Sequence, residues 1–305
     1  MDNLTHSLIG AALGQTGLKR LSGLGMPTLI IAANIPDVDA ACAVYGTASL
    51  SMRRGLTHGP IAMAVLPILL TGAMIAFDRW QARRGTRPQG RAAVRFWPLL
   101  LLAVIGTLSH PAFDWLNSYG IRLLAPFSSQ WFYGDALFII DPWIWVLLIG
   151  GWFWSRRAEK TAGNWSGRGR VIAGLLAIYV AGNIAISAHA SLLGRSDAPY
   201  PAVAVANPVP FAFWRRDVLW RTVDDRYGQF DYSLFEGIRR DDVRGAPTKI
   251  SPRVASDASK SADARAFLFW SRMPVARYDG NTLILSDQRF DNPLVRDRFA
   301  VRIER

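Results

Sequence analysis

The feature that most constrains the fold is a set of apolar runs long enough to cross a lipid bilayer. Residues 61–77, 96–113 and 171–193 contain no Asp, Glu, Lys or Arg. A backbone inside hydrocarbon must form its hydrogen bonds internally, which a helix of roughly 20 apolar residues does. Because 50% of the residues are hydrophobic, the chain is expected to be a membrane protein rather than a water-soluble one.

Six helical segments are expected in the first part of the chain. They cover residues 4–18, 21–34, 61–77, 96–113, 137–154 and 171–193. The first two are short for a full span, so we expect them to be half-buried or packed inside the bundle. Together the segments predict an all-α polytopic membrane bundle over residues 1–193.

A second domain is expected over residues 194–305, where the chain becomes charged and is punctuated by prolines. Alternating polar and apolar residues at 220–232 and 281–285 predict strands, and the second run follows an Asp-Gly turn signal. Residues 258–270 predict a helix. We therefore expect a small α+β domain outside the membrane.

The orientation follows from arginines in the short loops, which contribute to a formal net charge of +12. Loops at 19–20, 78–95 and 155–170 are expected to be cytoplasmic, since Lys and Arg flanking a span stay on that side. The pair Arg53-Arg54 is an exception to this rule. Both termini and the C-terminal domain are then expected to face the periplasm of a bacterial inner membrane, and nucleic-acid binding is not expected.

Ionisable residues gather at one end of the predicted bundle. Eight of them fall on the outer side, opposite the basic loops: His6, Asp37, Asp39, His58, His110, Asp114, Asp141 and His189. Such residues are costly at membrane depth and are usually functional there. Mixed imidazole and carboxylate ligands suit Zn²⁺, with Mn²⁺ as a second candidate. The sequence therefore predicts a metal site on this side.

Two Thr-His pairs, Thr5-His6 and Thr57-His58, echo each other at the start of apolar segments. A threonine can cap a helix, so the pairs are expected to place both imidazoles in first helical turns at equivalent heights.

His110 and Asp114 stand four residues apart, which places an imidazole and a carboxylate on one helix face. Pro111 disfavours an α conformation at His110, so we expect the helix to kink or restart there.

Each candidate also has a structural explanation that the sequence leaves open. The alternatives are a cap-region histidine for His6 and His58, a turn for Asp37 and Asp39, a hydrogen-bonded pair for His110 and Asp114, a helix cap for Asp141 and a packed histidine for His189. Asp141 fits a cap as well as it fits a ligand. His189 fits packing better.

At these residues the chain resembles a known family, the bacterial inner-membrane metal-dependent hydrolases of the YdjM-like type. The matching elements are Met1-Asp2-x-x-Thr5-His6, Ile35-Pro36-Asp37-x-Asp39, Arg54-Gly55-x-Thr57-His58, His110-Pro111-x-x-Asp114 and Ile140-Asp141-Pro142. The likeness covers most of residues 1–190 and is specific through the order and spacing of the motifs.

That family is in turn similar to zinc-dependent phospholipase C and single-strand nucleases. The resemblance implies that Asp37, His58, His110 and Asp114 bind one metal ion. It implies that His6 binds a second ion, with Asp114 as the bridge. One or two Zn²⁺ ions are expected.

The leading functional hypothesis is hydrolysis of a phosphoester, with lipid-linked phosphoesters among the candidates, at the outer membrane surface, with Asp37 or Asp39 orienting or deprotonating the attacking water. An ion-binding site of a transporter and a structural envelope protein are the alternatives. The sequence predicts contact with membrane lipids. It leaves the substrate and the oligomeric state open.

Overall fold

The computed structural model describes residues 1–197, 201–223, 226–239, 252–290 and 299–304, and the chain divides into two compact units. Unit 1 consists of Met1–Asp39, Arg54–Gly134 and Ile139–Gly182, and unit 2 of Ala40–Arg53, Asp135–Phe138 and Asn183–Arg305. Each unit has a hydrophobic core of its own.

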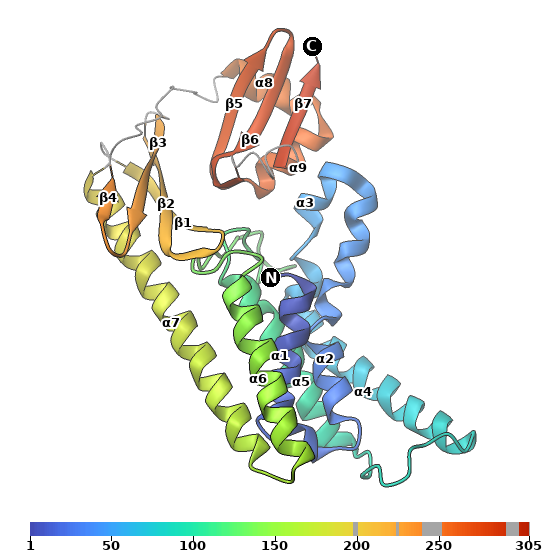
Figure 1. The fold of residues 1–305 in the computed structure, drawn as a ribbon. Helices are drawn as coiled ribbons and strands as arrows, with labels where there is room; N and C mark the ends of the chain where they lie inside the picture. The colour runs from blue at the N-terminus through green and yellow to red at the C-terminus, as the bar shows by residue number, and fades with distance from the viewer. Residues whose placement is uncertain (198–200, 224–225, 240–251, 291–298, 305) are drawn as a thin grey trace. The chain divides into compact units, whose positions relative to one another are not determined.

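Unit 1 is helical, which confirms the expectation for the N-terminal region. Its helices are α1 (Asn3–Gln15), α2 (Gly25–Ala32), α4 (Pro60–Arg83), α5 (Phe96–Trp115), α6 (Pro142–Lys160) and the first part of α7 (Trp165–Asp197). Single turns of 3₁₀ helix lie between them at η1 (Leu18–Leu21) and η3 (Leu56–His58). Helix α1 packs against α2, α5 and α6, and α5 also packs against α2 and α4 (Figure 1).

Small residues allow α1, α2 and α5 to approach closely. A Cβ atom added at Gly10 of α1 would lie 2.6 Å from the carbonyl oxygen of Leu29 in α2. A Cβ atom at Gly106 of α5 would lie 2.6 Å from the Cβ of Ala32. Small residues at such contacts are the usual basis of helix packing in membranes. The three helices therefore form a tight group around which the polar residues are arranged.

In the part of the chain that the structure describes, four helical stretches are long and apolar enough to cross a membrane. They are Gly25–Met52, Pro60–Arg83, Phe96–Trp115 and Trp165–Ser196. The first joins α2, the 3₁₀ segment η2 (Ile35–Ala48) and α3 (Ser49–Met52), and its backbone is non-helical at Gly46.

The expected count of six segments is not confirmed. Helix α1 has 13 residues, which is about 20 Å at 1.5 Å per residue and short of a bilayer core of about 30 Å. Helix α6 ends in the sequence Ser-Arg-Arg-Ala-Glu-Lys, so its charged last turns shorten its apolar part.

Helix α5 runs through Pro111 to Trp115, so the expected restart at His110 is wrong. A proline inside a helix removes one backbone hydrogen bond. One face of the turns around it, with Thr107, His110 and Asp114, is fully buried, and the packing of this face holds the helix together.

The expected threonine caps are also wrong. Asp2 caps α1, because its carboxylate accepts a bond of 3.0 Å from the backbone N–H of Thr5. Thr57 and His58 lie in η3, and α4 begins only at Pro60. His6 therefore sits inside a helix, whereas His58 precedes one. The similar Thr-His sequences of the two pairs did not reveal that they occupy different positions relative to a helix.

Unit 2 contains two antiparallel sheets, which confirms a C-terminal β-sheet domain. The first has the strand order β1 (Pro201–Val209), β2 (Ala212–Thr222), β3 (Tyr227–Ser233) and β4 (Gly237–Arg239), and the second has β5 (Pro274–Asp279), β6 (Thr282–Asp287) and β7 (Ala300–Glu304). The helices α8 (Pro252–Lys260) and α9 (Ala262–Trp270) precede the second sheet.

The strands predicted from alternation match this arrangement. Residues 220–232 form the β2–β3 hairpin, although residues 224–225 lie outside the described part, and 281–285 fall on β6. The helix predicted at 258–270 is divided at Ser261, whose hydroxyl accepts the N–H of Ala264 and caps α9.

The first sheet packs on the part of α7 that belongs to unit 2. Val218 and Trp220 of β2 pack with Ala190. Arg216 is fully buried, and its Nε donates to Ser187 Oγ at 2.7 Å while its Nη2 donates to Asn183 Oδ1 at 3.0 Å. Hydrogen bonds to a buried charged group are stronger than neutral ones, so Arg216 fixes β2 along α7.

Candidate metal centre

Four predicted ligand residues come together in unit 1. One ligand atom each of Asp37, His58, His110 and Asp114 lies within 4.8 Å of the other three, and all four residues are buried. Asp37 comes from η2, His58 from η3, and the last two from one face of α5. Buried ionisable groups are costly unless they are paired or bind a metal, so the partners of each group indicate whether the cluster suits an ion.

The backbone fixes which nitrogen of His110 faces the cluster. Its Nδ1 lies 2.7 Å from the carbonyl oxygen of Ala33. Because a carbonyl oxygen only accepts, Nδ1 carries the hydrogen, and in the neutral imidazole Nε2 then keeps its lone pair. The Nε2 of His110 is the atom that faces Asp37 and Asp114.

The same logic orients His58 through two side chains. The Thr57 hydroxyl donates to Asp39 Oδ2 at 2.9 Å, so its oxygen can accept from His58 Nδ1, also at 2.9 Å. His58 Nε2 then keeps its lone pair toward the cluster. Burial lowers the pKa of His58, although Asp114 acts in the opposite direction. The neutral imidazole that results is the form that binds metals.

With these neutral tautomers, hydrogen-bond acceptor atoms of the four residues face one another across the cluster. The Nε2 atoms of His58 and His110 lie 3.1 Å apart. Asp114 Oδ2 lies 3.5 Å from each of them, and Asp37 Oδ1 lies 3.6 Å from His110 Nε2. None of these four groups brings a hydrogen to the others in the tautomers described. A divalent cation satisfies all four at once, and two nitrogens with two oxygens form a typical zinc ligand set.

Asp39, another predicted ligand, lies behind His58 rather than in the cluster. Its Oδ2 accepts the Arg54 backbone N–H at 2.7 Å and the Thr57 hydroxyl, and it lies 3.5 Å from His58 Nδ1. Carboxylates in this position orient a ligating imidazole and raise its basicity. Asp39 thus contacts His58 from behind and is not one of the four clustered ligand residues.

Arg54 is a part of the site for which no role was predicted from the sequence. Its Nε lies 3.0 Å from Asp114 Oδ2, and its Nη1 donates to Asn117 Oδ1 at 3.0 Å. The side chain is buried and lies over the ring of Tyr119. Its position four residues before His58, inside one of the motifs, was the signal that could have revealed it.

Two glycines let a loop close over the segment that carries His58. A Cβ atom at Gly55 would lie 2.2 Å from an Arg122 guanidinium nitrogen, and one at Gly59 would lie 1.9 Å from the carbonyl oxygen of Ala125. Arg122 also donates its backbone N–H to the Arg54 carbonyl at 2.8 Å. The loop at 122–125 therefore contacts the His58 segment both before and after His58.

His6 adjoins the cluster without being one of its four members. Its Nε2 lies 3.3 Å from Asp114 Oδ1, and its ring stacks on His110 with 3.8 Å between centroids. Its Nδ1 is buried and has no hydrogen-bond partner among the described residues. The amino group of Met1 also contacts Asp114 Oδ1. Asp114 is therefore shared between two groups of possible ligands.

The two remaining candidates have structural partners elsewhere. Asp141 caps α6, accepting the N–H groups of Trp143 and Ile144 at 3.0 and 3.2 Å and the hydroxyl of Tyr179. His189 lies in unit 2, where its Nδ1 is 2.9 Å from the hydroxyl of Tyr232. These contacts match the cap and the packed histidine that the sequence left open.

Comparison with known proteins identifies the family of this chain. The family model described as YdjM inner membrane protein matches residues 1–190, which is more than half of the chain and includes every residue of the cluster. No curated protein and no solved structure matches the chain. The family description agrees with the apolar helices of unit 1. The chain belongs to the YdjM inner membrane protein family.

Proposed function

We propose that this protein is a membrane-bound, metal-dependent hydrolase that cleaves a phosphoester at the outer face of the inner membrane. The observation that carries the proposal is the buried convergence of Asp37, His58, His110 and Asp114. A structural histidine or a helix cap does not require four acceptors to face one another. A cation site explains all of them.

Zn²⁺ is the ion that we propose, since two imidazoles and two carboxylates suit a borderline-soft cation. A bound divalent cation would supply hydroxide at neutral pH by lowering the pKa of a water ligand from 15.7 to about 7, and would neutralise charge on phosphoryl oxygens. Mn²⁺ is the second candidate. The contacts of His6 allow a second ion that shares Asp114.

The chain's own residues divide the remaining work. Asp37 is 9% exposed, whereas His58 is 1% and His110 0% exposed, so water and substrate reach the cluster from the Asp37 side. A carboxylate there can accept a hydrogen bond from the attacking water and orient it. Asp39 acts through His58, because its Oδ2 is engaged by Arg54 and Thr57.

Arg54 pairs with Asp114 and so reduces the negative charge that the cluster presents to an anionic substrate. Guanidinium groups match phosphate geometry and stay charged when buried. The resemblance to zinc-dependent phospholipase C adds an analogy for phosphodiesters, and the membrane setting adds one for lipid-linked substrates. Both are arguments by analogy.

The test measures turnover on the purified, detergent-solubilised chain with added Zn²⁺. Bis(p-nitrophenyl) phosphate serves as a soluble diester and phosphatidylglycerol vesicles as a lipid diester. We expect hydrolysis of at least one, with loss of most of the rate in His110→Ala and little change in His189→Gln. The control removes the same residue type from unit 2, so a difference between the variants reports on the cluster.

Two outcomes oppose the proposal. Bound metal without turnover on either diester would leave an ion-handling or structural protein, the alternatives from other functional classes. Equal rates in His110→Ala and wild type would mean that any hydrolysis observed does not come from this cluster.

A further inference from the structure

Apolar side chains gather at one end of the first sheet of unit 2. Phe211, in the turn between β1 and β2, is 71% exposed, and Phe235, in the turn between β3 and β4, is 79% exposed. Leu234 beside it is 49% exposed. In an antiparallel meander alternate turns lie at the same end of the sheet, so these residues form one patch, the apolar sheet end.

The backbone at Phe211 adds to this observation. Phe211 has a φ of 63°, the left-handed region that Gly or Asn adopts at least cost. A bulky aromatic residue therefore occupies a turn position for which it is poorly suited.

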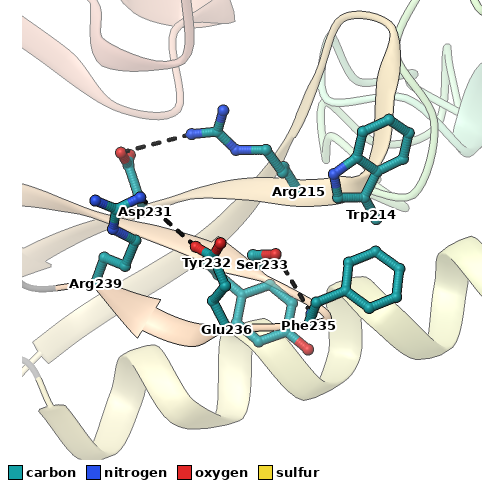
Figure 2. Close-up of a pocket in the computed structure, with 8 residues that line it drawn as sticks. All are labelled: Trp214, Arg215, Asp231, Tyr232, Ser233, Phe235, Glu236 and Arg239. Carbon is teal, nitrogen blue, oxygen red and sulfur yellow. Dashed lines mark hydrogen bonds and ion pairs between the residues drawn. The ribbon is translucent and has the colours of Figure 1, made fainter.

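The surroundings of the apolar sheet end resemble a membrane interface. Trp214 and Phe235 lie on one side of a small pocket, and Asp231 and Arg239 lie on the other (Figure 2). Arg215, which pairs with Asp231, and Glu236, which pairs with Arg239, also line this pocket. Aromatic rings beside charged side chains occur in segments at the level of lipid headgroups, where arginines can meet lipid phosphates.

The direction in which β2 runs along α7 indicates which part of that helix lies nearest the apolar sheet end. Arg216 bonds Asn183 and Ser187 near the start of the unit 2 part of α7, whereas Val218 contacts the position of Gly194 further along. The β1–β2 turn therefore points toward lower residue numbers of α7. That helix is apolar enough to span a membrane over Trp165–Ser196. Asn183 and Ser187 fall inside this stretch, so β2 packs on a part of α7 that is apolar enough to span a membrane.

We propose that the apolar sheet end inserts into the bilayer surface beside α7, with Phe211 and Phe235 among the lipid acyl chains and Arg215 and Arg239 near the headgroups. The occupant of the patch is lipid, rather than a second copy of the chain or another protein. The insertion anchors unit 2 to the membrane through two turns in addition to its helix. It does not depend on the metal centre.

Site-specific quenching by brominated lipid tests the insertion. Cys42, the only cysteine of the chain, is replaced by Ser, and single cysteines are introduced by Phe211→Cys, Phe235→Cys and Val223→Cys. Each variant of the full chain carries a bimane label and is placed in vesicles of phosphatidylethanolamine and phosphatidylglycerol containing dibrominated phosphatidylcholine. Val223 is 84% exposed in the turn after β2, at the other end of the sheet, and is the matched control.

We expect the bimane labels at positions 211 and 235 to lose most of their emission in brominated vesicles, whereas the label at 223 keeps nearly all of it. Iodide in the buffer should give the reverse order. Equal quenching at 211 and 223 by brominated lipid would overturn the proposal, as would protection of 211 from both quenchers, which would show that protein covers the patch. All three positions are exposed, so the substitutions remove little packing.

Discussion

At the scale of single residues, the centre depends on which nitrogen of each imidazole carries hydrogen. The Ala33 carbonyl sets this for His110, and the Thr57–Asp39 pair sets it for His58. Such partners are often as important to metal affinity as the ligands themselves. His58 and His110 would bind the ion directly, whereas Asp39 would act on it through His58.

Asp39→Asn tests this distinction. It removes the anionic partner behind His58 while leaving the four cluster residues in place, so we expect Zn²⁺ affinity to fall about 10- to 100-fold. Competition with a chelating dye on the purified chain measures the change. Asp78→Asn is the control, because Asp78 pairs with Arg87 and Arg91. Unchanged affinity in Asp39→Asn would remove the positioning role.

Residue type and position at the predicted helix ends gave eight candidates, and the family resemblance implied the four that come together in the cluster. Its outer partners were harder to predict, because a backbone carbonyl such as that of Ala33 carries no signal in the sequence and lies 77 positions from His110. Arg54 looked like a loop charge, and only its contact with Asp114 gives it a role.

At the scale of helices and strands, close approach of α1 and α2 positions His6 beside α5. Gly10→Ala would push a methyl group to within 2.6 Å of the Leu29 carbonyl oxygen, so we expect a loss of about 1–3 kcal/mol in unfolding free energy. Gly72→Ala in α4 meets no atom within 4 Å and should cost nothing. Thermal unfolding in detergent, followed by circular dichroism, compares them. Equal midpoints would contradict the packing argument.

The first sheet of unit 2 carries a carboxylate that opposes folding at neutral pH. Asp217 of β2 lies directly opposite Asp231 of β3. Burial and the nearby Asp231 together raise the pKa of Asp217 to about 6, and Arg215 acts against them. Because the folded pKa exceeds the unfolded one, the contribution of Asp217 to stability is greatest at low pH and is lost as pH rises from about 4 to 6.

Asp217→Asn should remove this part of the pH dependence and stabilise the sheet by about 1–3 kcal/mol at pH 7. Denaturant unfolding of the full chain at pH 5 and pH 7, followed by tryptophan fluorescence, measures it. Asp279→Asn, at an exposed strand end, is the control. A variant that is no more stable than wild type at pH 7 would contradict the prediction.

Helices and strands with a strong hydrophobic pattern were predictable, whereas the segments that carry the site were less so. The runs at 96–113 and 281–285 match α5 and β6 closely. Asp37 and His58 lie in 3₁₀ segments, which have no distinctive periodicity. The break of the predicted helix at Ser261 depends on one capping hydroxyl.

At the scale of the whole molecule, Arg54 resolves a difficulty in the expected orientation. The pair Arg53-Arg54 opposed the positive-inside rule, but Arg54 is 5% exposed and pairs with Asp114. A buried, paired arginine is part of the site and does not count as a loop charge. The remaining basic loops then favour one orientation, with the cluster outside.

Cysteine labelling tests that orientation. In a Cys42→Ser background, Gln130→Cys and Thr86→Cys place exposed thiols in the two opposite sets of loops. A maleimide that cannot cross membranes should label position 130 in intact spheroplasts and position 86 only after permeabilisation. Labelling of 86 in intact spheroplasts would reverse the orientation and place the cluster on the cytoplasmic side.

The most direct test of the central claim is the metal content of the purified chain, measured by inductively coupled plasma mass spectrometry. Wild type and His189→Gln should retain about one or two Zn²⁺ per chain, and His110→Ala, which removes one of the four cluster ligands, should lose most of it. Absence of metal from wild type, or equal content in His110→Ala and wild type, would contradict a metal centre at Asp37, His58, His110 and Asp114.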